Sequence, residues 1–586
     1  MLNFSEQCMD MAHSILSHNI GAVNQDGSIT PAEGETTLRD EAGHVAMALG
    51  EFYRATGSTT LDDYDIADLS AKCIMAQANA DEGSEDGLAY SALGLLSFNP
   101  SKERNAIWEK LDEETKKNLD KRLLARTDYD NSFQMYNIAK AVARFSMGLS
   151  KKDETGKLID RFVERIEMYS TAKFFDDKPD EGLAGAFDIL GVASFVFIRQ
   201  ALQLHANIHL RDRKIPSLRT YAEKYLRILP DIVRADGLGW AFGKKIGAYG
   251  QMHLISMILQ AMRDNWIAED KMPDYMDILR RLFQFFFMTY IDQESGTLVI
   301  EDAERSASEL KTTRLANFDA ARYLCQWSRL AKSINRPMQA RTTPAKTGGR
   351  YVSFDNTPKK EQGVFIYQNI ETGLHVHLPI IASNGSVDIT SAMTFPHMAG
   401  IFDWPSNNYL PIMTPELTFA GKQTVPSFYG KKCISGIGLR NAYFFKYEQP
   451  DLITKDGEIL KDSGSCKVNW TFSGNKITGE FAYSVKTPTT LDKMRLVVAI
   501  AAPHSEHFAP ASYTIGEAGL GIEVEKDDFG AEWKDTEIVS DDPNYKTYWG
   551  KIHYLQTLER DEPLVMRPGL QYKLIISFNP DIINIG

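Results

Sequence analysis

The chain has 586 residues, more than one hydrophobic core usually organises, so we expect two or more domains. Apolar residues make up 43% and charged residues 24% of the sequence, as in ordinary globular proteins. The net charge of -13 argues against a general nucleic-acid-binding protein but allows an anionic ligand in a local basic cleft. The sequence shows no apolar run long enough to span a membrane. The five cysteines are scattered and odd in number, which predicts neither a disulfide framework nor a cysteine metal site.

The first part of the chain, to about residue 335, is typical of successive amphipathic or buried helices. Residues 38–56 show the pattern well, because Thr37 can cap a helix whose apolar residues recur at helical spacing. Short loops make successive helices antiparallel neighbours, so we predict an (α/α) toroid, an incomplete barrel of helical hairpins. Further helices are expected near 5–20, 61–80, 86–97, 112–125, 132–149, 153–172, 184–207, 215–229, 247–264, 271–290 and 314–334.

The sequence changes character near residues 335–350, which are polar, contain prolines and lack apolar periodicity. Beyond them, short alternating segments such as 363–368 and 572–578 are separated by Asn-Gly, Asp-Gly and Asn-Pro turns, which predicts antiparallel strands. The predicted fold class is therefore α+β multidomain. Its expected parts are a catalytic toroid at 1–335, a linker at 336–350 and an antiparallel β-sandwich at 351–586.

A glycine-rich stretch, residues 236–250, leads directly into a helical pattern and places Tyr249 in or just before its first turn. The positive end of the helix and the neighbouring Lys244 and Lys245 favour the ionised form of a phenol, whose ordinary pKa is about 10. A phenol that loses its proton readily can act as a general base. The plainer interpretation is that the glycines mark a turn and the tyrosine is a core aromatic residue.

Polar residues elsewhere in the helical part are candidates for the same groove. Asn131 stands at an expected helix start, where it would serve as an N-cap or donate to a substrate carboxylate. Asn137 follows on the same helix, and His253 lies one turn after the tyrosine, although a lone histidine on an apolar helix is more often a core residue. Arg305 and Arg314 could clamp a carboxylate in two-pronged fashion, or belong to a solvated loop.

The β part contains one segment, residues 394–411, that is unusually dense in aromatic and polar side chains, as loops that line sites often are. Trp404 would offer a sugar-stacking face and His397 an acid/base group, unless both rings only pack the domain junction. Tyr409 and, in the helical part, Trp240 are further candidates for substrate contact.

A metal site is not expected from the histidines. His375 and His377 share one face of a strand, but no third ligand stands out near them. We therefore predict no cofactor and no catalytic metal, and leave a structural divalent metal open.

Together these pieces resemble polysaccharide lyases built from an (α/α) toroid and an antiparallel β domain. Chondroitin AC, hyaluronate and xanthan lyases form one such family, and heparinase III and alginate lyases another. In the first family an Asn-Trp motif opens one toroid helix, and a later segment runs from Asp-Gly to Gly-x-Tyr-Gly. Here Asn131-Ser-Phe stands at the first motif, and Asp236-Gly followed by Gly247-Ala-Tyr-Gly250 stands at the second, with Tyr249 on the catalytic tyrosine.

One departure concerns a histidine that the chondroitin-lyase-like segment carries between Asp-Gly and the tyrosine. This chain has none there. Lys244 or Lys245 would take the charge-neutralising part, or His397 would supply the imidazole, as a β-domain histidine does in the heparinase III type.

The resemblance implies carbohydrate degradation by β-elimination at a uronic acid. A base removes the proton next to the carboxylate and the sugar oxygen leaves from the next carbon, so the carboxylate charge must be quenched. Asn131 with an arginine or lysine would supply this, Tyr249 would take the proton or give one to the leaving oxygen, and His397 would be its partner. The implied substrate is an anionic polysaccharide containing a uronate such as glucuronate, with a rhamnosyl-glucuronate linkage as one candidate.

Two other functions and the location of the protein stay open. A glycoside hydrolase on the same toroid needs two carboxylates flanking the bond. Glu41, Asp180, Glu181 and Asp236 are available without forming a convincing pair. A non-catalytic glycan-binding protein would need no such groups. Residues 1–7 do not resemble a signal peptide. We expect a periplasmic or secreted bacterial protein whose signal has been trimmed, and leave a cytoplasmic one open.

Overall fold

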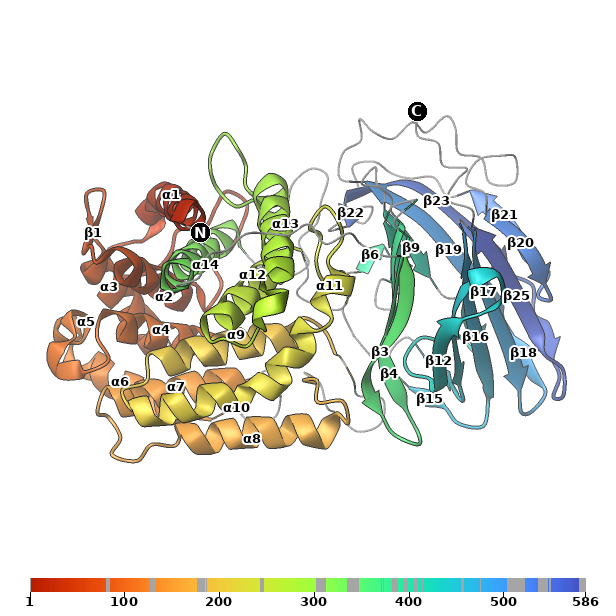
Figure 1. Cartoon of the computed structure of the whole chain (residues 1–586), viewed down its shortest axis with the longest axis horizontal. Coiled ribbons are helices and arrows are strands. Elements are labelled where there is room, and N and C mark those ends of the chain that lie inside the picture. Colours follow the sequence, from red (N-terminus) through yellow and green to blue (C-terminus); the bar gives the residue numbers. More distant parts are fainter. Residues whose placement is uncertain are drawn as a thin grey trace.

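The computed structural model describes residues 2–80, 85–126, 133–176, 185, 187–242, 247–301, 312–334, 347–369, 371, 374–381, 388–390, 393–394, 398–403, 409–413, 415–454, 458–474, 476–502, 522–535, 546–547 and 550–578. The first part of the chain is helical, and the second consists of antiparallel sheets that lie beside it (Figure 1). This succession confirms the predicted α+β order of elements. No described helix has both the length and the apolar character needed to cross a bilayer.

An inner set of helices forms a ring in which each contacts the next and the last contacts the first. The ring closes between its last and first members, where His44 bonds to Asp319 and Arg329 pairs with Glu51. It is therefore closed, whereas the sequence predicted an incomplete barrel. In chain order its members are α2 (Glu41–Thr56), α4 (Glu85–Phe98), α7 (Gln134–Ser146), α9 (Leu190–Gln203), α12 (Ala248–Arg263) and α14 (Thr313–Ser333).

The remaining long helices alternate with the ring helices along the chain, and each packs on one or two of them. They are α1 (Leu2–Asn19), α3 (Ile66–Asn79), α6 (Glu113–Leu124), α8 (Thr155–Tyr169), α10 (Ile208–Leu226) and α13 (Met272–Tyr290). Because every second helix returns the chain, the ring helices run in the same direction. Their N-terminal ends therefore gather at one end of the ring and their C-terminal ends at the other.

Most helix boundaries lie within a few residues of the predicted ones, and the exceptions have local causes. Helix α10 begins at Ile208, not near 215, because the side chain of Asn207 caps it and Pro216 is accommodated inside it. A separate short helix, α11 (Leu229–Ile232), follows. Thr37 does not cap α2, since its hydroxyl donates to the carbonyl oxygen of Ile29 at 3.0 Å.

The β part consists mainly of two antiparallel sheets that share one core. The 11-stranded sheet contains β3 (Gly348–Asn356), β4 (Glu361–Asn369), β5 (Leu374–Ile380), β8 (Met398–Asp403), β9 (Tyr409–Met413), β10 (Glu416–Phe419), β11 (Lys422–Thr424), β19 (Lys493–Ala502), β21 (Glu532–Asp535), β22 (Lys546–Thr547) and β23 (Gly550–Arg560). The 6-stranded sheet contains β12 (Lys431–Ile437), β13 (Tyr443–Gln449), β16 (Gly464–Ser473), β17 (Lys476–Val485), β20 (Ile522–Asp527) and β25 (Tyr572–Phe578). Strand β3 begins within the stretch expected to be a linker.

Strand β4 lies between two hydrophobic cores. Its side chains point alternately into one core and the other, and so show how the helical part and the β part join. Phe365 and Tyr367 point into the core between the sheets, where the Phe365 ring stacks 5.1 Å from that of Phe445. Val364 and Ile366 point the opposite way and belong to the core of the helical part. Side chains alternate between the two faces of a strand, so a strand buried on both faces reads as a continuous apolar run. The larger sheet therefore separates the two cores.

The junction between helices and sheet also contains specific polar contacts. Arg350 on β3 donates from Nε to Asp231 on α11 at 2.7 Å. The Ser170 hydroxyl donates to the carbonyl oxygen of Phe354 at 2.5 Å, and the Phe354 ring lies 4.9 Å from that of Phe174. These bonds hold β3 against the end of α8 and against α11.

His375 and His377 on β5 lie in this junction, with their rings 4.6 Å apart. Nε2 of His375 donates to the carbonyl oxygen of Asp231 at 2.7 Å. Burial lowers the pKa of His375 to about 4, and burial together with His375 lowers the pKa of His377 well below its ordinary value. Both are therefore neutral packing groups at neutral pH.

Acidification should weaken the folded state through His375. The unfolded chain binds this proton with a pKa near 6.5, whereas the folded chain binds it only near 4. The contribution to stability is therefore complete above pH 6.5 and is lost as the pH falls from 6.5 to 4, by about 3 kcal/mol. His375→Gln should flatten this part of the curve of unfolding free energy against pH. His209→Gln, at an exposed position on α10, is the control and should leave it unchanged. Equal slopes for all three proteins would contradict the assignment.

Candidate active site

Two glycines of the stretch before α12 are required by the backbone. Gly237 has a φ of +103°, and a Cβ there would lie 2.0 Å from the carbonyl oxygen of Arg281. Gly247, directly before the helix, has a φ of 73° and a ψ of -141°. The side-chain amide of Gln251 donates to the carbonyl oxygen of Gly237 at 3.0 Å, which ties the stretch to the first turn. Tyr249 is thereby held as the second residue of α12, where the sequence placed it.

The hydroxyl of Tyr249 donates to Oδ2 of Asp319 at 2.9 Å, and the side chain is 7% exposed. The hydroxyl is thus bonded to a charged partner and is not sealed among apolar groups. In this arrangement the phenol holds its proton. The structure brings a carboxylate to Tyr249, whereas the sequence predicted only cations beside it, and Lys244 and Lys245 lie outside the described residues.

Asp319, on the second turn of α14, connects three ring helices. Its Oδ1 accepts from Nδ1 of His44 at 2.8 Å and from Nη2 of Arg322 at 3.0 Å, while Oδ2 accepts from Tyr249. A carboxylate only accepts, so the hydrogen is on Nδ1 of His44, and Nε2 lies 3.5 Å from Oδ2 of Asp40. We call Tyr249, His44, Asp319 and Arg322 the Asp319 cluster. All four side chains are buried at the N-terminal end of the ring.

Two tyrosines enclose the Asp319 cluster. The ring of His44 stacks on that of Tyr90, with centroids 3.7 Å apart. The guanidinium carbon of Arg322 lies 4.0 Å from the ring centroid of Tyr323 and 5.2 Å from that of Tyr90. Burial alone would lower the pKa of Arg322, but Tyr323 and Asp319 raise it above its ordinary value. Arg322 therefore remains a cation inside the ring.

His253 and Asn137, two predicted groove residues, are also buried on ring helices. Nδ1 of His253 lies 3.0 Å from the hydroxyl of Tyr323, and its ring centroid lies 6.4 Å from that of Tyr249. His253 therefore contacts Tyr323, which packs on the Asp319 cluster. Asn137 lies on the first turn of α7 and is 1% exposed.

Arg314 and Trp240 take different places from those predicted. Arg314 donates to Oδ1 of Asn19 on α1 at 2.8 Å. It stands five residues before Asp319, hence about 140° around the helix from it. The ring of Trp240 is 3% exposed and lies 4.7 Å from that of Phe242 in the junction with the sheet. Neither side chain faces the Asp319 cluster, and the indole packs the junction.

Several predicted site residues, or their side chains, lie outside the part of the chain that the structure describes. Tyr409 begins β9 and pairs with Asp403 on β8, but its side chain is not described. The following lie outside the described residues altogether: Asn131, Lys244, Lys245, Arg305, His397 and Trp404.

The sequence interpretation missed His44, Asp319 and Arg322. A signal for the last two is present in α14, where Asp319, Arg322 and Gln326 recur at helical spacing among apolar residues. Polar residues at buried positions of a helix need partners, so such a stripe indicates a polar interior facing other helices.

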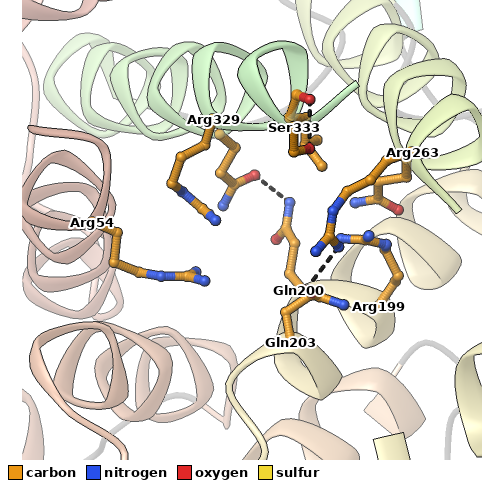
Figure 2. Close-up of a pocket in the computed structure, with 10 residues that line it drawn as sticks. Arg54, Arg199, Gln200, Gln203, Arg263, Arg329 and Ser333 are labelled. Carbon is orange, nitrogen blue, oxygen red and sulfur yellow. Dashed lines mark hydrogen bonds between the residues drawn. The ribbon is translucent and has the colours of Figure 1, made fainter. Parts of the chain in front are cut away.

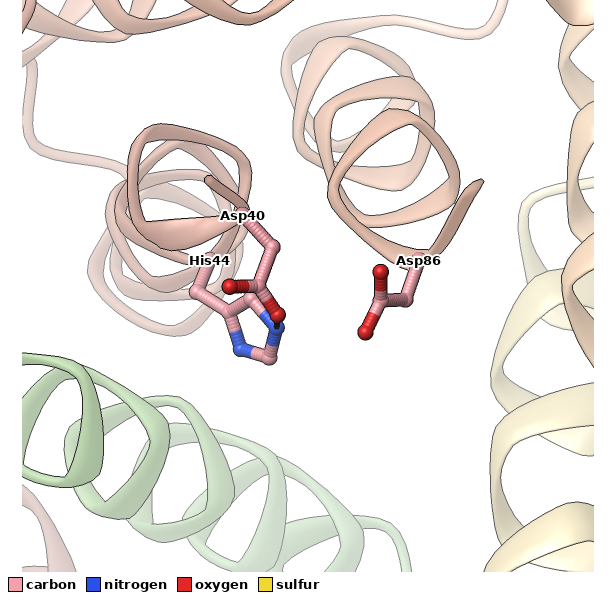
Figure 3. Close-up of side chains that lie close together, drawn as sticks. All are labelled: Asp40, His44 and Asp86. Carbon is pink, nitrogen blue, oxygen red and sulfur yellow. Dashed lines mark ion pairs between the residues drawn. The ribbon is translucent and has the colours of Figure 1, made fainter. Parts of the chain in front are cut away.

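Asp40, His44 and Asp86 form a group in which one potential ligand atom of each lies within 4.8 Å of the others (Figure 3). Within the described residues this group could hold a cation, because it offers two carboxylate oxygens and an imidazole nitrogen. One oxygen of each carboxylate lies within 4.8 Å of the other, so the two groups form a close pair.

The carboxylates considered for a hydrolase are less suitable. Glu41 is fully buried and accepts from the Thr312 hydroxyl, and burial raises its pKa. Asp236 accepts from Nε of Arg234 at 2.8 Å. Asp180 and Glu181 lie outside the described residues.

Comparison with known proteins finds no matching family model and no matching curated protein. Solved structures with similarity include the chondroitin AC lyase of Streptomyces coelicolor A3 in complex with chondroitin sulphate, at 11% identity and a TM-score of 0.47, covering 98% of this chain and 79% of that one. A glycosyl hydrolase of family 88 from Bacteroides vulgatus is 10% identical, with a TM-score of 0.40, and covers 56% of this chain and 99% of that one. A heparinase III is 9% identical, with a TM-score of 0.40, and covers 98% and 84%. The function therefore has to be argued from the residues of this chain.

Proposed function

We propose that this protein is a polysaccharide lyase that cleaves a uronate-containing glycan by β-elimination. The observation that carries the proposal is the Tyr249 hydroxyl, bonded at 2.9 Å to a carboxylate that also accepts from a histidine and an arginine. Such a phenol can pass a proton in both directions, because its own proton has an acceptor at hydrogen-bond distance. This gives the predicted acid/base role a partner, Asp319, that the sequence did not suggest.

In the proposed reaction Tyr249 takes the proton from the carbon next to the uronate carboxylate, and its hydroxyl proton passes to Asp319. The electron pair of the broken C–H bond forms a C=C bond as the glycosidic C–O bond on the next carbon breaks. The leaving oxygen then takes a proton from Tyr249, which recovers its own from Asp319. One glycan gives two fragments, one of them with an unsaturated uronate, and neither water nor an oxidant is consumed.

The groups proposed to mask the uronate carboxylate are Asn131 with Lys244, Lys245 or Arg305, and His397 is proposed as a second acid/base group from the β part. These role assignments are based on the sequence motifs alone. A positive cleft of this kind would bind an anionic polysaccharide, with a rhamnosyl-glucuronate linkage as one candidate, and would serve a bacterial protein that acts in the periplasm or outside the cell.

A second candidate function is a glycoside hydrolase, and one observation favours it. Asp40 and Asp86 offer carboxylate oxygens within 4.8 Å of each other at the N-terminal end of the ring. Retaining glycosidases hold their two carboxyl groups about 5–5.5 Å apart. A hydrolase would add water across the bond and would form no unsaturated sugar.

The test is to incubate the protein with a panel of uronate-containing polysaccharides and to follow ultraviolet absorbance and reducing ends together. We expect at least one substrate for which both signals rise in proportion, because each elimination makes one C=C bond and one reducing end. Reducing ends without absorbance would reject the lyase and support the hydrolase. Saturable binding with neither signal would support a glycan-binding protein.

A further inference from the structure

The C-terminal ends of the ring helices, opposite the Asp319 cluster, surround a cavity of about 230 Å³ (Figure 2). Four arginines line it, and each comes from a different ring helix: Arg54 on α2, Arg199 on α9, Arg263 on α12 and Arg329 on α14. The closed ring thus brings together cations that are far apart in the sequence.

Two carboxylates offset part of this charge. Glu51 accepts from Nη1 of Arg54 at 2.7 Å and from Nη2 of Arg329 at 2.5 Å. Asp264 accepts from Nε and Nη2 of Arg199 at 2.7 Å each. The strong charge-assisted bonds of these three arginines therefore go to protein carboxylates.

Arg263 is bonded differently. Its Nη1 donates to the neutral Oε1 of Gln203 at 2.8 Å and lies 3.7 Å from the nearest oxygen of Asp264. Four guanidinium groups (+4) against Glu51 and Asp264 (-2) leave two positive charges around the cavity. Arg263 and Arg329 are the most exposed of the four side chains, at 33% and 29%, so solvent reaches this end.

Buried donors in the cavity wall also lack acceptors. Nε2 of Gln200 donates to Oε1 of Gln326, which leaves the donor Nε2 of Gln326 and the acceptor Oε1 of Gln200 without partners among the described residues. Nε of Arg329 is likewise a buried donor without an acceptor among the described residues. Gln326 is only 2% exposed, and buried donors of this kind are normally satisfied. The two donors, Nε2 of Gln326 and Nε of Arg329, need an acceptor, as an anion would provide.

The attraction of cations to helix C-terminal ends does not explain this arrangement. Arginines placed for that purpose lie near the last carbonyl oxygens of their own helix. Here the four arginines bond to side chains that line or flank the cavity. Burial lowers the pKa of Arg54 and of Arg263, and a neighbouring arginine lowers each further. Cations are held together against their mutual repulsion, which favours a site that receives negative charge.

We propose that this cavity is a binding site for a small tetrahedral dianion, namely sulfate or hydrogen phosphate. Two net positive charges and arginines from four ring helices match such an ion. The volume is below the roughly 300–1,000 Å³ of pockets for drug-sized ligands, which favours a small ion as the occupant. The site is separate from the Asp319 cluster and does not depend on the lyase proposal.

Calorimetric titration of the purified protein with sodium sulfate and, separately, sodium phosphate tests the proposal, with sodium chloride at equal ionic strength as the reference. Sulfate stabilises many proteins without binding them, so the decisive reading is saturable heat and not melting temperature alone. We expect one site per chain for at least one of the two ions. Arg263→Gln should weaken binding about tenfold or more, because it removes one charge yet leaves both carboxylates paired.

Gln203→Glu is a second test, in which a carboxylate is added to the cavity wall instead of a cation being removed. The new carboxylate would face Arg263, so we expect a higher melting temperature without added anion and little remaining affinity for sulfate. Arg219→Gln, an exposed arginine on α10 outside the cavity, is the control and should bind like the parent protein. No saturable heat in the parent, or unchanged binding in both cavity variants, would overturn the proposal.

Discussion

Tyr249→Phe should lower kcat for the glycan substrate by about 10²–10⁴-fold, the usual contribution of one acid/base group. The substitution removes only the hydroxyl that donates to Asp319, and the ring keeps its place in the first turn of α12. KM should change little, since the phenol is assigned to proton transfer and not to holding the sugar. Initial rates of ultraviolet absorbance for parent and variant measure both quantities.

Tyr323→Phe is the matched control for that experiment. It removes the same kind of group from the neighbouring helix, where the hydroxyl lies 3.0 Å from Nδ1 of His253. We expect a much smaller loss of kcat. Equal losses in the two variants would show that buried hydroxyls matter here only for packing. Full activity in Tyr249→Phe would remove the tyrosine from the mechanism.

Asp319→Asn should lower the free energy of unfolding by about 3–5 kcal/mol, because it leaves Arg322 buried without its carboxylate. The side chains of Asp319 and Arg322 are each 1% exposed. The carboxylate also accepts from His44 and Tyr249. Urea denaturation at neutral pH measures the change. Activity should fall as well, since an amide cannot take the phenol proton.

Two further variants separate this effect from a general sensitivity to lost charge. Asp120→Asn breaks an ion pair with Arg144 in which the carboxylate is 41% exposed, and should cost less than about 1 kcal/mol. The double change Asp319→Asn with Arg322→Gln should be less harmful than Asp319→Asn alone, because no uncompensated cation remains. If the double variant is less stable than the single one, the assigned cause is wrong.

The order of helices and strands could be predicted from the sequence because periodicity and turn residues are local signals. The exceptions are places where a distant contact decides. Pro216 sits inside α10 although proline usually starts or breaks a helix. The closure of the ring depends on contacts between Asp319 and His44, which are 275 residues apart. No local pattern reports such a contact.

The candidate site was predictable in part for the same reason. The position of Tyr249 follows from the glycines before it, which are local. Arg314 and Arg322 both lie on α14, and periodicity alone does not say which side of a largely buried helix meets the ring interior and which meets α1. The predicted arginine lies on the α1 side, and Arg322 occupies the interior.

The core of the helical part includes side chains from one face of the larger sheet. Val364, Ile366 and Phe354, from the sheet, are members of the same apolar cluster as the helical ring. A protease that cuts the backbone between residues 334 and 347 should therefore leave a nicked protein that elutes as one species in native conditions and separates only in denaturant. By the same logic, exchanging the β part for that of a distant homologue would succeed only if the face of the helical part beneath it were redesigned as well.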